Sequence, residues 1–483
     1  MKTALPKQFV TRMADLLGNQ LQAFLHTYEE SPLHGLRINP LKSSIEELTS
    51  KPTFTLQSVP WCDYGFYYPA SERPGKHPHH AAGLYYLQEP SAMAVAGAVG
   101  VEPGETILDL CAAPGGKSTQ LAGYLQGDGL LISNEIHPTR AKALSENIER
   151  LGITNAIVTN ETPERLRDHF PLFFDRILVD APCSGEGMFR KLPEAIDDWS
   201  EEKVLECHRM QTDILDAAHQ MLKPGGTLVY STCTFAPLEN ERTIEEFLQN
   251  YPDYQLELVP HAELFAQGQP EWSRSQDPAL SKTSRLWPHL LNGEGHYLAK
   301  LIKPLDDVQE ATESSLAIQD SDQKRSNKKR MGRKSDKPSS GIPKEALTAW
   351  EAFASDALYE GHKSLFHNRF TLFGEQLYHL PSDAFSLNGL KIVRAGWHLG
   401  TVKKNRLEPS HALALAIRPE QAKRVVNFSA DDPQIIRYLK GETLQADGPN
   451  GWTLVTVDGY SIGWGKLVDG QLKNHYPKGL RWV

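Results

Sequence analysis

Residues 227–234 read TLVYSTCT, a short apolar and β-branched run that ends at Cys233 and Thr234. The KPGG sequence at 223–226 is typical of a turn that ends a helix and begins a strand. In an open α/β sheet, the reactive groups stand at the carboxyl ends of the buried strands. The stretch therefore predicts a strand of such a sheet, with Cys233 at its functional end.

Two more predicted strands end in polar or glycine-rich sequence. The run RILVD at 176–180 leads into DAPCSG, which contains Asp180 and Cys183, and residues 106–118 read TILDLCAAPGGKS. Because the carboxyl ends of parallel strands meet at one edge of a sheet, we expect one site assembled from distant parts of the chain.

Between residues 91 and 304, predicted strands alternate with predicted helices, which is the pattern of a doubly wound α/β sheet. Strands are expected at 106–110, 130–135, 156–160, 175–180, 227–232, 255–259 and 296–303, and helices at 117–126, 138–151, 201–222 and 238–250. Residues 1–90 form a separate opening module, and the polar segment 305–342 is predicted to be a disordered linker. Two small domains of mixed α/β to mostly β structure are expected at 343–420 and 421–483.

The overall composition is that of a soluble globular protein. The chain has 483 residues, 40% hydrophobic and 23% charged, which fits roughly three domains. It lacks the run of about 20 apolar residues that a membrane span needs, and its first residues do not resemble a secretory signal. Its five cysteines are far apart, which argues against a disulfide framework. We expect a cytoplasmic, monomeric protein with no membrane partner.

The charge is unevenly distributed. Net charge is −9, yet residues 324–337 contain eight Lys or Arg. A local basic strip allows an acidic protein to bind RNA, but solvated linkers are often charged as well. Both interpretations of this strip stay open.

Three motifs, in the order DLCAAPGGKS, DAPCSG and STCT and each after a predicted strand, resemble the RNA (cytosine-5) methyltransferase family of the NOL/NOP/Sun type. The match continues in LRINPLK at 36–42, TNETPERL at 159–166 and RLWPH…GEGHYLAKL at 285–301, which are similar to the F-type branch that acts on bacterial small-subunit ribosomal RNA. The resemblance covers nearly the whole chain, least sharply over the last 180 or so residues.

This resemblance implies a Rossmann-like core that uses S-adenosylmethionine (AdoMet) to form 5-methylcytosine in 16S ribosomal RNA. Ribosomal RNA or the small ribosomal subunit would be the partner. The opening module would pack on the core and help to hold RNA, and the last domain would be a PUA-like RNA-binding domain. A transfer-RNA cytosine-5 methyltransferase would have identical catalytic motifs. An RNA-binding or ribosome-assembly protein with an idle methyltransferase site is the other alternative, against which the presence of both cysteines, Asp180 and Glu135 argues.

The loop at 111–117 is not arranged for a phosphate. A P-loop would need Gly where Cys111 stands, and the GxGxxG spacing of dinucleotide sites is missing. Backbone groups and a helix N-terminus suit the methionine part of AdoMet, and Glu135 can bind its ribose hydroxyls. Asn160 or Thr162 would contact the adenine. The predicted cofactor-binding residues are Cys111, Ala112, Ala113, Pro114, Gly115, Gly116, Lys117, Glu135, Asn160, Thr162 and Asp180.

Two cysteines compete for the role of nucleophile. Carbon 5 of cytosine becomes reactive when a thiolate adds to carbon 6. Pro182-Cys183 is similar to the nucleophile of DNA cytosine methyltransferases, whereas Thr232-Cys233 is the arrangement of the RNA family. The resemblance implies that Cys233 attacks and that Cys183 assists release of the product. Asp180 would compensate the charge that develops at ring nitrogen 3.

Four residues are predicted to contact RNA, and three histidines to be inert. Arg37 and Asn39 lie two apart on a predicted strand and share a face, for which a solvated surface is the alternative. Arg190 and Lys191 follow the DAPCSG loop and could contact phosphates or simply face solvent. The histidines at 77, 79 and 80 lack a Cys or carboxylate at ligand spacing, so no metal site is predicted.

Overall fold

A computed structural model describes residues 4–50, 53–305, 342–359, 369–382, 385–404 and 406–483. The basic strip at 324–337 and nearly all of the predicted linker lie outside these residues. Among the described residues, no helix has both the length and the apolar character needed to cross a membrane.

The centre of the molecule is a sheet whose five middle strands run parallel in the order β9-β8-β5-β6-β7. Their bounds are Thr106–Asp109 (β5), Leu130–Asn134 (β6), Ala156–Thr159 (β7), Phe174–Asp180 (β8) and Leu222–Thr232 (β9). The chain leaves β5 toward β6 on one side and later adds β8 on the other side. The strand order therefore reverses between β5 and β8, where an open sheet leaves a ligand crevice.

Antiparallel strands close the β9 side of the sheet, and they include the two predicted at 255–259 and 296–303. They are β10 (Gln255–Glu257), β11 (Ala266–Gln267), β12 (Ser284–Leu286) and β13 (His296–Ile302), of which β13 pairs with β9. The predicted turn at 223–226 instead lies inside β9, as an irregularity in the pairing with β8, and Gly225 has φ +75° there.

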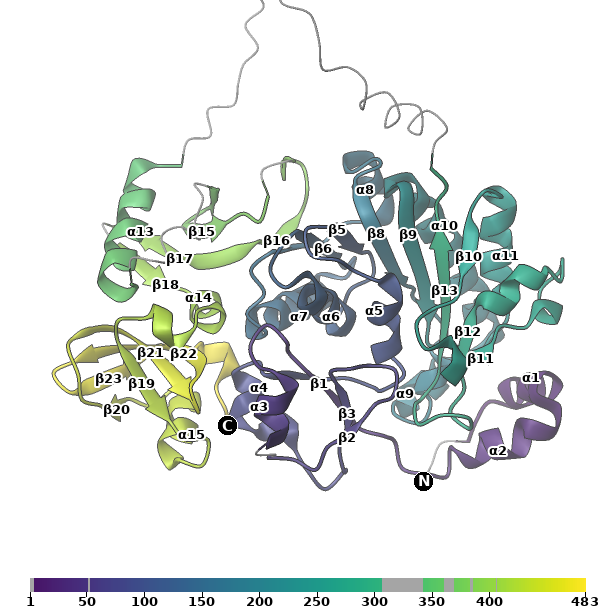
Figure 1. Cartoon of the computed structure of the whole chain (residues 1–483), viewed down its shortest axis with the longest axis horizontal. Helices are drawn as coiled ribbons and strands as arrows, with labels where there is room; N and C mark the ends of the chain where they lie inside the picture. The colour runs from purple at the N-terminus through teal and green to yellow at the C-terminus, as the bar shows by residue number, and fades with distance from the viewer. Residues whose placement is uncertain (1–3, 51–52, 306–341, 360–368, 383–384, 405) are drawn as a thin grey trace, which may run out of the picture.

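Helices cover both faces of the sheet (Figure 1). One face carries α5 (Met93–Val99), α6 (Gly116–Leu125) and α7 (Pro138–Arg150), and the other carries α8 (Pro163–His169), α10 (Glu201–Met221) and α11 (Glu241–Asn250). Alternating strand residues supply the two cores: Leu131 is buried toward α6 and α7, and Ile132 toward the opposite face. Such continuous apolar runs are typical of strands that are buried on both sides.

The opening module consists of two parts. Its helices α1 (Lys7–Leu17) and α2 (Leu21–His26) pack Phe9 and Phe24 against Phe189, Phe235 and Trp287 of the central domain. Its sheet has the order β2-β3-β1-β4, and its elements are Gly35–Ile38 (β1), Ile45–Ser50 (α3), Gln57–Ser58 (β2), Gly65–Tyr67 (β3), Pro78–Ala81 (α4) and Tyr85–Leu87 (β4). The short helix α9 (Pro193–Asp197) lies in the central domain beside α1 and α2 (Figure 1).

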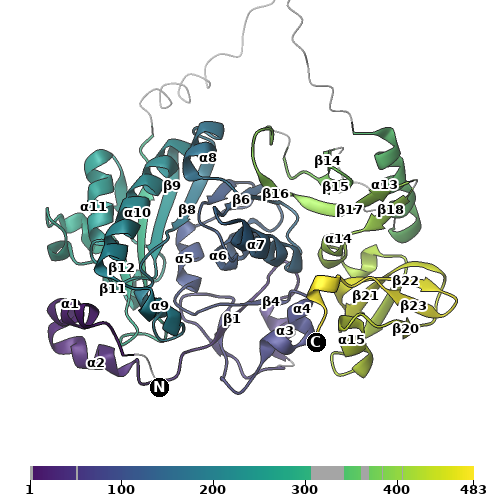
Figure 2. The ribbon, with the colours of Figure 1, turned by 180° about the vertical axis from the view of Figure 1, so that it is seen from behind.

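The C-terminal region contains two small sheets that share an apolar core around Trp350, Leu377 and Trp464. The first part has α13 (Lys344–Ala357), β14 (Phe370–Phe373), β15 (Gln376–His379), β17 (Trp397–Lys403), β18 (Arg406–Pro409) and α14 (His411–Ala416). The second has β19 (Val425–Phe428), α15 (Pro433–Leu439), β20 (Leu444–Gln445), β21 (Gly451–Val457), β22 (Tyr460–Val468) and β23 (Gln471–Asn474). Tyr438 of the second part shares a core with Leu36 and Ala82 of the opening module. Figure 2 shows the second part and the opening module side by side.

One C-terminal strand belongs to the central sheet. β16 (Ile392–Ala395) pairs antiparallel with β7, beyond which the central sheet would otherwise have an unpaired edge. Arg394 also donates to Ser145 Oγ (3.1 Å) and forms an ion pair with Glu149 on α7, at 2.5 Å. The C-terminal region therefore completes the central domain as well as following it in the chain.

A chain that ends at residue 304 should lose this support. Removing β16 exposes the edge of β7 and leaves Glu149 without its cation, so we expect the melting temperature to fall by roughly 5–10 °C and the fragment to self-associate. Thermal unfolding and analytical ultracentrifugation measure both effects. A monomeric fragment with the melting temperature of the full chain would contradict the role given to β16.

Candidate active site

Two thiols lie in contact at neighbouring strand ends. The pairing of Asp180 with Ser231 fixes the register of β8 and β9, so the loops after the two strands start side by side. Cys183 Sγ and Cys233 Sγ are 3.3 Å apart, and both cysteines are half-buried. The hydrogen bond to Cys233, burial, and the charges of Cys233 and Glu239 hold the pKa of Cys183 well above its usual range. Cys183 therefore holds its proton tightly.

Asp180 is held from two sides beside the thiols. Lys117 Nζ forms an ion pair with Asp180 Oδ2 at 2.7 Å, and Ser231 Oγ donates to Asp180 Oδ1 at 2.6 Å. Burial opposes the charge on Lys117, but Asp180 and Cys233 interact with it and its pKa is raised overall. The ammonium therefore stays charged next to Asp180 and Cys233.

The glycine-rich loop is fixed by side chains from α7. Arg140 Nη2 donates to the Ala113 carbonyl and Asn147 Nδ2 to the Pro114 carbonyl, each at 2.9 Å. Gly115 has φ +111°, a conformation that favours glycine. The first N–H groups of α6, which begins at Gly116, have no acceptor within the helix and are available to an anionic group.

A buried carboxylate stands beneath this loop. Asp109 ends β5 and accepts a hydrogen bond from Ser118 Oγ at 2.6 Å. Its other oxygen, Oδ1, is buried without a hydrogen-bond partner in the described part of the chain. Burial raises the pKa of Asp109 to about 7 even though the bond from Ser118 lowers it. The sequence motifs did not single out Asp109, although its position at the end of TILD was a usable signal.

Glu135 lies just after β6, as predicted, and its carboxylate is almost fully buried. Oε1 accepts a hydrogen bond from His137 N at 2.9 Å, and Arg140 Nη1 is 3.5 Å from Oε2. The next residue, Ile136, is 52% exposed. Asn160 Nδ2 donates to the carbonyls of Glu135 (2.7 Å) and Ile136 (2.8 Å) and thus fixes this turn.

Comparisons with known proteins identify the family. The profile described as 16S rRNA methyltransferase RsmB/F matches residues 97–302. The N-terminal domain, first C-terminal domain and PUA domain of RsmF match residues 5–90, 352–417 and 425–482. Ribosomal RNA small subunit methyltransferase F of Aliivibrio fischeri (strain MJ11) is 30% identical over 492 residues, which cover 99% of this chain and 97% of that protein. The protein of the same name from Vibrio cholerae (strain M66-2) is 30% identical over 501 residues, with coverages of 99% and 98%.

The chain belongs to the RsmF family of 16S rRNA methyltransferases.

Solved structures agree with this assignment. A methyltransferase homologue from Pyrococcus horikoshii shares 30% identity at a TM-score of 0.55, over 62% of this chain and 95% of that chain. NSun6 from Pyrococcus horikoshii, solved with SFG, shows the same fold at 22% identity and a TM-score of 0.51, with coverages of 62% and 99%. The predicted Rossmann-like core, PUA-like last domain and ribosomal RNA methyltransferase activity are thus confirmed.

Arg37 and Asn39, which were predicted to contact RNA, are buried and form hydrogen bonds within the protein. Arg37 is 4% exposed and donates to the Gly116 carbonyl (3.0 Å) and Thr119 Oγ1 (2.8 Å) at the start of α6. Asn39 Nδ2 donates to the carbonyls of Gly83 and Leu151, each at 2.9 Å. Neither side chain faces solvent or is free to bind RNA in this structure. Both instead dock the opening module on α6 and α7.

Arg190 is also engaged within the protein. It donates to Glu294 Oε2 (2.6 Å) and to the carbonyls of Thr27 and Gly293 (3.2 Å each), and so joins three segments. Lys191 Nζ is 3.9 Å from Glu294 Oε1, a looser contact, so its predicted role at a phosphate stays a prediction. Thr162 Oγ1 caps α8 by accepting from Arg165 N at 3.4 Å, and its predicted adenine contact likewise stays a prediction.

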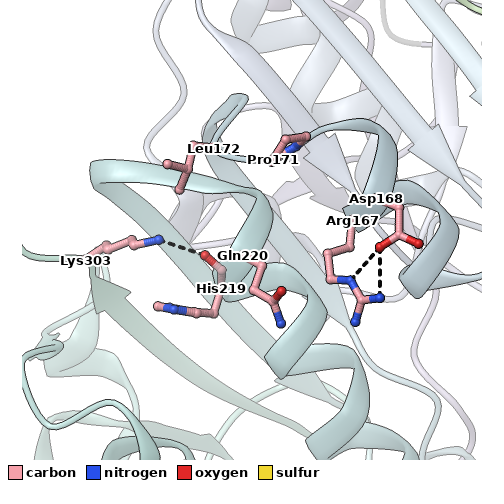
Figure 3. A pocket seen from close by; sticks show the side chains of 7 residues that line it. All are labelled: Arg167, Asp168, Pro171, Leu172, His219, Gln220 and Lys303. Carbon is pink, nitrogen blue, oxygen red and sulfur yellow. Dashed lines mark hydrogen bonds and ion pairs between the residues drawn. The ribbon is translucent and has the colours of Figure 1, made fainter.

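His79 and the hollow described below lie outside the candidate active site. His79 Nε2 lies 2.8 Å from Asp458 Oδ2, a contact that ties the opening module to the last domain. Across the described ranges, no three His, Cys, Asp or Glu side chains are grouped to hold a metal ion. A hollow of about 440 Å³ contains Leu172, His219 and Lys303 (Figure 3), but it lies at the amino ends of β8 and β9, the edge opposite the thiols.

Arg37→Leu tests the reassignment of this residue. The substitution leaves the Gly116 carbonyl and the Thr119 hydroxyl without their buried donor, so we expect a loss of about 2–3 kcal/mol of unfolding free energy by denaturant titration. Lys142→Ala, which removes an exposed side chain on α7, serves as the control and should change stability little. A stable Arg37→Leu protein with weakened RNA binding would restore the predicted RNA contact.

Proposed function

We propose that this RsmF-family protein uses AdoMet to methylate carbon 5 of cytosine in 16S rRNA through a covalent bond between Cys233 Sγ and ring carbon 6. The observation that supports the proposal most is the thiol pair, 3.3 Å apart beside Asp180. Methylation of an oxygen or of an exocyclic nitrogen would need no thiol, because those atoms are nucleophilic already. A pyrimidine carbon requires covalent activation.

The donors and acceptors around the glycine-rich loop fit AdoMet. Glu135 offers a carboxylate for the two ribose hydroxyls, and Ile136 offers an exposed apolar side chain for the face of the adenine. The free N–H groups at Gly116 suit the carboxylate of the methionine part, and the unpartnered Oδ1 of Asp109 suits its ammonium group. When bound, AdoMet supplies an electrophilic methyl group.

The charges around the thiols favour Cys233 as the nucleophile. The thiolate, not the thiol, attacks carbon 6, and the raised pKa of Cys183 makes that residue the poorer source of a thiolate. The ammonium of Lys117 interacts with Cys233 and stabilises its negative charge. This difference between Cys183 and Cys233 is supported by the neighbouring residues of this chain. It agrees with the role of nucleophile that the family resemblance implies for Cys233.

The reaction can then be followed at the protein's own groups. As the bond between Cys233 Sγ and carbon 6 forms, ring electrons move toward carbon 5, and nitrogen 3 takes up a proton from the Lys117 ammonium through Asp180, with which that ammonium is paired at 2.7 Å. Bonding also removes the negative charge of Cys233, so Cys183 can now release its proton to solvent. The Cys183 thiolate then takes the proton from methylated carbon 5, the double bond re-forms, and Cys233 leaves as the thiolate. Nitrogen 3 returns its proton, and the resting pair is restored.

The family match favours ribosomal over transfer RNA as the substrate, since the related proteins are named for the small-subunit RNA. The idle-site alternative is disfavoured because Cys183 and Cys233 are in contact and Asp180, which ends β8, is paired with Lys117. We also propose that the C-terminal PUA domain binds the RNA. Cytoplasmic location and a monomeric state stay predictions.

Glu135→Ala should weaken AdoMet binding by about 1–3 kcal/mol, because two ribose hydroxyls would lose their buried acceptor. Isothermal titration calorimetry measures this change. Glu146→Ala, on the exposed side of α7, is the matched control and should bind AdoMet normally. Equal affinities for the two variants would remove Glu135 from the cofactor site.

The two cysteine variants should fail at different steps. Cys233→Ala should abolish methylation and covalent trapping on RNA that contains 5-fluorocytosine, since no thiolate adds to carbon 6. Cys183→Ala should still add and methylate but release slowly, so a covalent adduct with ordinary RNA should accumulate on a denaturing gel. Asp180→Asn should prevent adduct formation in either background. The reverse behaviour of the two cysteines would favour Cys183 as the nucleophile.

A further inference from the structure

The two cysteine loops are bridged by buried polar groups that the reaction above does not use. Ser184 follows Cys183, and Thr234 follows Cys233. Their hydroxyl oxygens, Ser184 Oγ and Thr234 Oγ1, are 2.8 Å apart, and both residues are buried. The loops are thus joined one residue beyond the two thiols.

Glu239 lies behind this bridge, in the turn before α11, and is fully buried. Its carboxylate accepts hydrogen bonds from Ser184 N (2.8 Å) and Ser184 Oγ (2.5 Å), and from Thr234 Oγ1 (3.3 Å). Gln211 Nε2 donates to Glu239 Oε1 at 3.1 Å and to the Pro182 carbonyl at 2.9 Å. One carboxylate therefore holds both residues that flank Cys183 in sequence, one directly and one through Gln211.

The loop of Cys233 has other supports. Thr232 Oγ1 donates to Asn240 Oδ1 at 2.6 Å, and Asn240 Nδ2 donates to the Thr234 carbonyl at 2.9 Å. The Cys233 carbonyl accepts from Gly187 N at 2.8 Å, and Phe235 N donates to Glu186 at 3.0 Å. Loss of Glu239 would consequently free Cys183 much more than Cys233.

The two buried carboxylates of this region, Glu186 and Glu239, also differ in whether a cation is paired with them. Glu186 forms an ion pair with Arg12 of α1 and accepts a hydrogen bond from Trp199 Nε1 at 2.9 Å. Glu239 forms no ion pair with any residue in the described part of the chain. Burial and the charge of Glu186 raise the pKa of Glu239 to about 7, and the charge of Glu239 in turn helps to raise the pKa of Cys183.

We propose that Glu239 is a positioning residue that holds the Cys183 thiol against Cys233 and thereby controls release of the methylated base, while attack by Cys233 proceeds without it. The inference rests on the proposed function, because it assumes the covalent bond to carbon 6. Glu239 touches neither the base nor the cofactor in this scheme. It acts through the backbone and hydroxyl of Ser184 and through Gln211.

The test compares Glu239→Ala and Glu239→Gln in the full-length protein with AdoMet and a 16S rRNA transcript. For Glu239→Ala we expect adduct with ordinary RNA to rise at least about tenfold, and trapping on 5-fluorocytosine RNA to stay within about threefold of the wild type. Glu239→Gln keeps one acceptor oxygen for Ser184 N and should fall between the wild type and the alanine variant. Calorimetric AdoMet affinity should not change in either variant.

Glu245→Ala is the matched control. Glu245 lies on α11 and is also buried, but its carboxylate accepts from the backbone N–H groups of Arg274 (2.9 Å) and Ser275, away from the cysteine loops. This variant should show no adduct accumulation. Should Glu239→Ala fail to fold, Glu239→Gln and Ser184→Ala, which removes only the hydroxyl, carry the same comparison.

The outcomes separate the inference from the proposed function. Two outcomes would overturn the positioning role and leave a purely structural one. In the first, the Glu239 variants accumulate no more adduct than Glu245→Ala. In the second, the rate of trapping on 5-fluorocytosine RNA and the rate of product release fall by the same factor. A wild-type protein that is not trapped on 5-fluorocytosine RNA would instead overturn the covalent chemistry itself. Selective slowing of release, partly restored by glutamine, supports the proposal.

Discussion

The site depends on the parallel pairing of β8 with β9. Because Asp180 is paired with Ser231, the loops after these strands leave the sheet side by side and bring Cys183 and Cys233 into contact. A shift of one residue in this register would turn Asp180 or Ser231 toward the opposite face and separate Asp180 from Lys117. The pairing is secured by continuous burial, since Leu178 and Val229 lie in the core on one face of the sheet and Val179 and Tyr230 in the core on the other.

The glycine-rich loop is stabilised by the domains on either side of the central one. Arg37 of the opening module binds the first turn of α6, and Arg140 and Asn147 of α7 bind the loop itself. From the C-terminal side, the Lys391 backbone accepts from Asn160 N at 2.9 Å and donates to Glu161 Oε1 at 2.6 Å, at the end of β7. The C-terminal domains thereby also support the proposed cofactor site, because Asn160 fixes the turn that follows Glu135. These domains hold one wall of that site in place.

The sequence predicted the parts of this structure that local patterns encode. The strands were predicted because each is an apolar run, and the two cysteines, Asp180 and Glu135 were singled out because each stands at or shortly after the end of such a run. The burial of Arg37 was not predicted, because a polar residue on a short strand usually faces solvent, whereas here it donates to groups 79 to 83 positions away. Glu239 carried no signal of its own, since its partners Ser184 and Gln211 are 55 and 28 residues distant. The joining of β16 to β7 lies across more than 230 residues and follows from burial of an edge, which no local pattern reports.

The charges in the crevice suit binding of a cationic cofactor but do not suit binding of the RNA backbone. Asp109, Asp180 and Glu135 bring three carboxyl groups to the strand ends, and Lys117 is the cation paired directly with Asp180. Such a site attracts the cationic sulfonium and ammonium groups of AdoMet, but it repels phosphate oxygens. In the proposed reaction, a cytosine would therefore enter as a base turned away from its backbone, for which unpaired RNA is best suited. On this proposal the phosphates are held by surfaces outside the crevice, which is the role proposed above for the PUA domain.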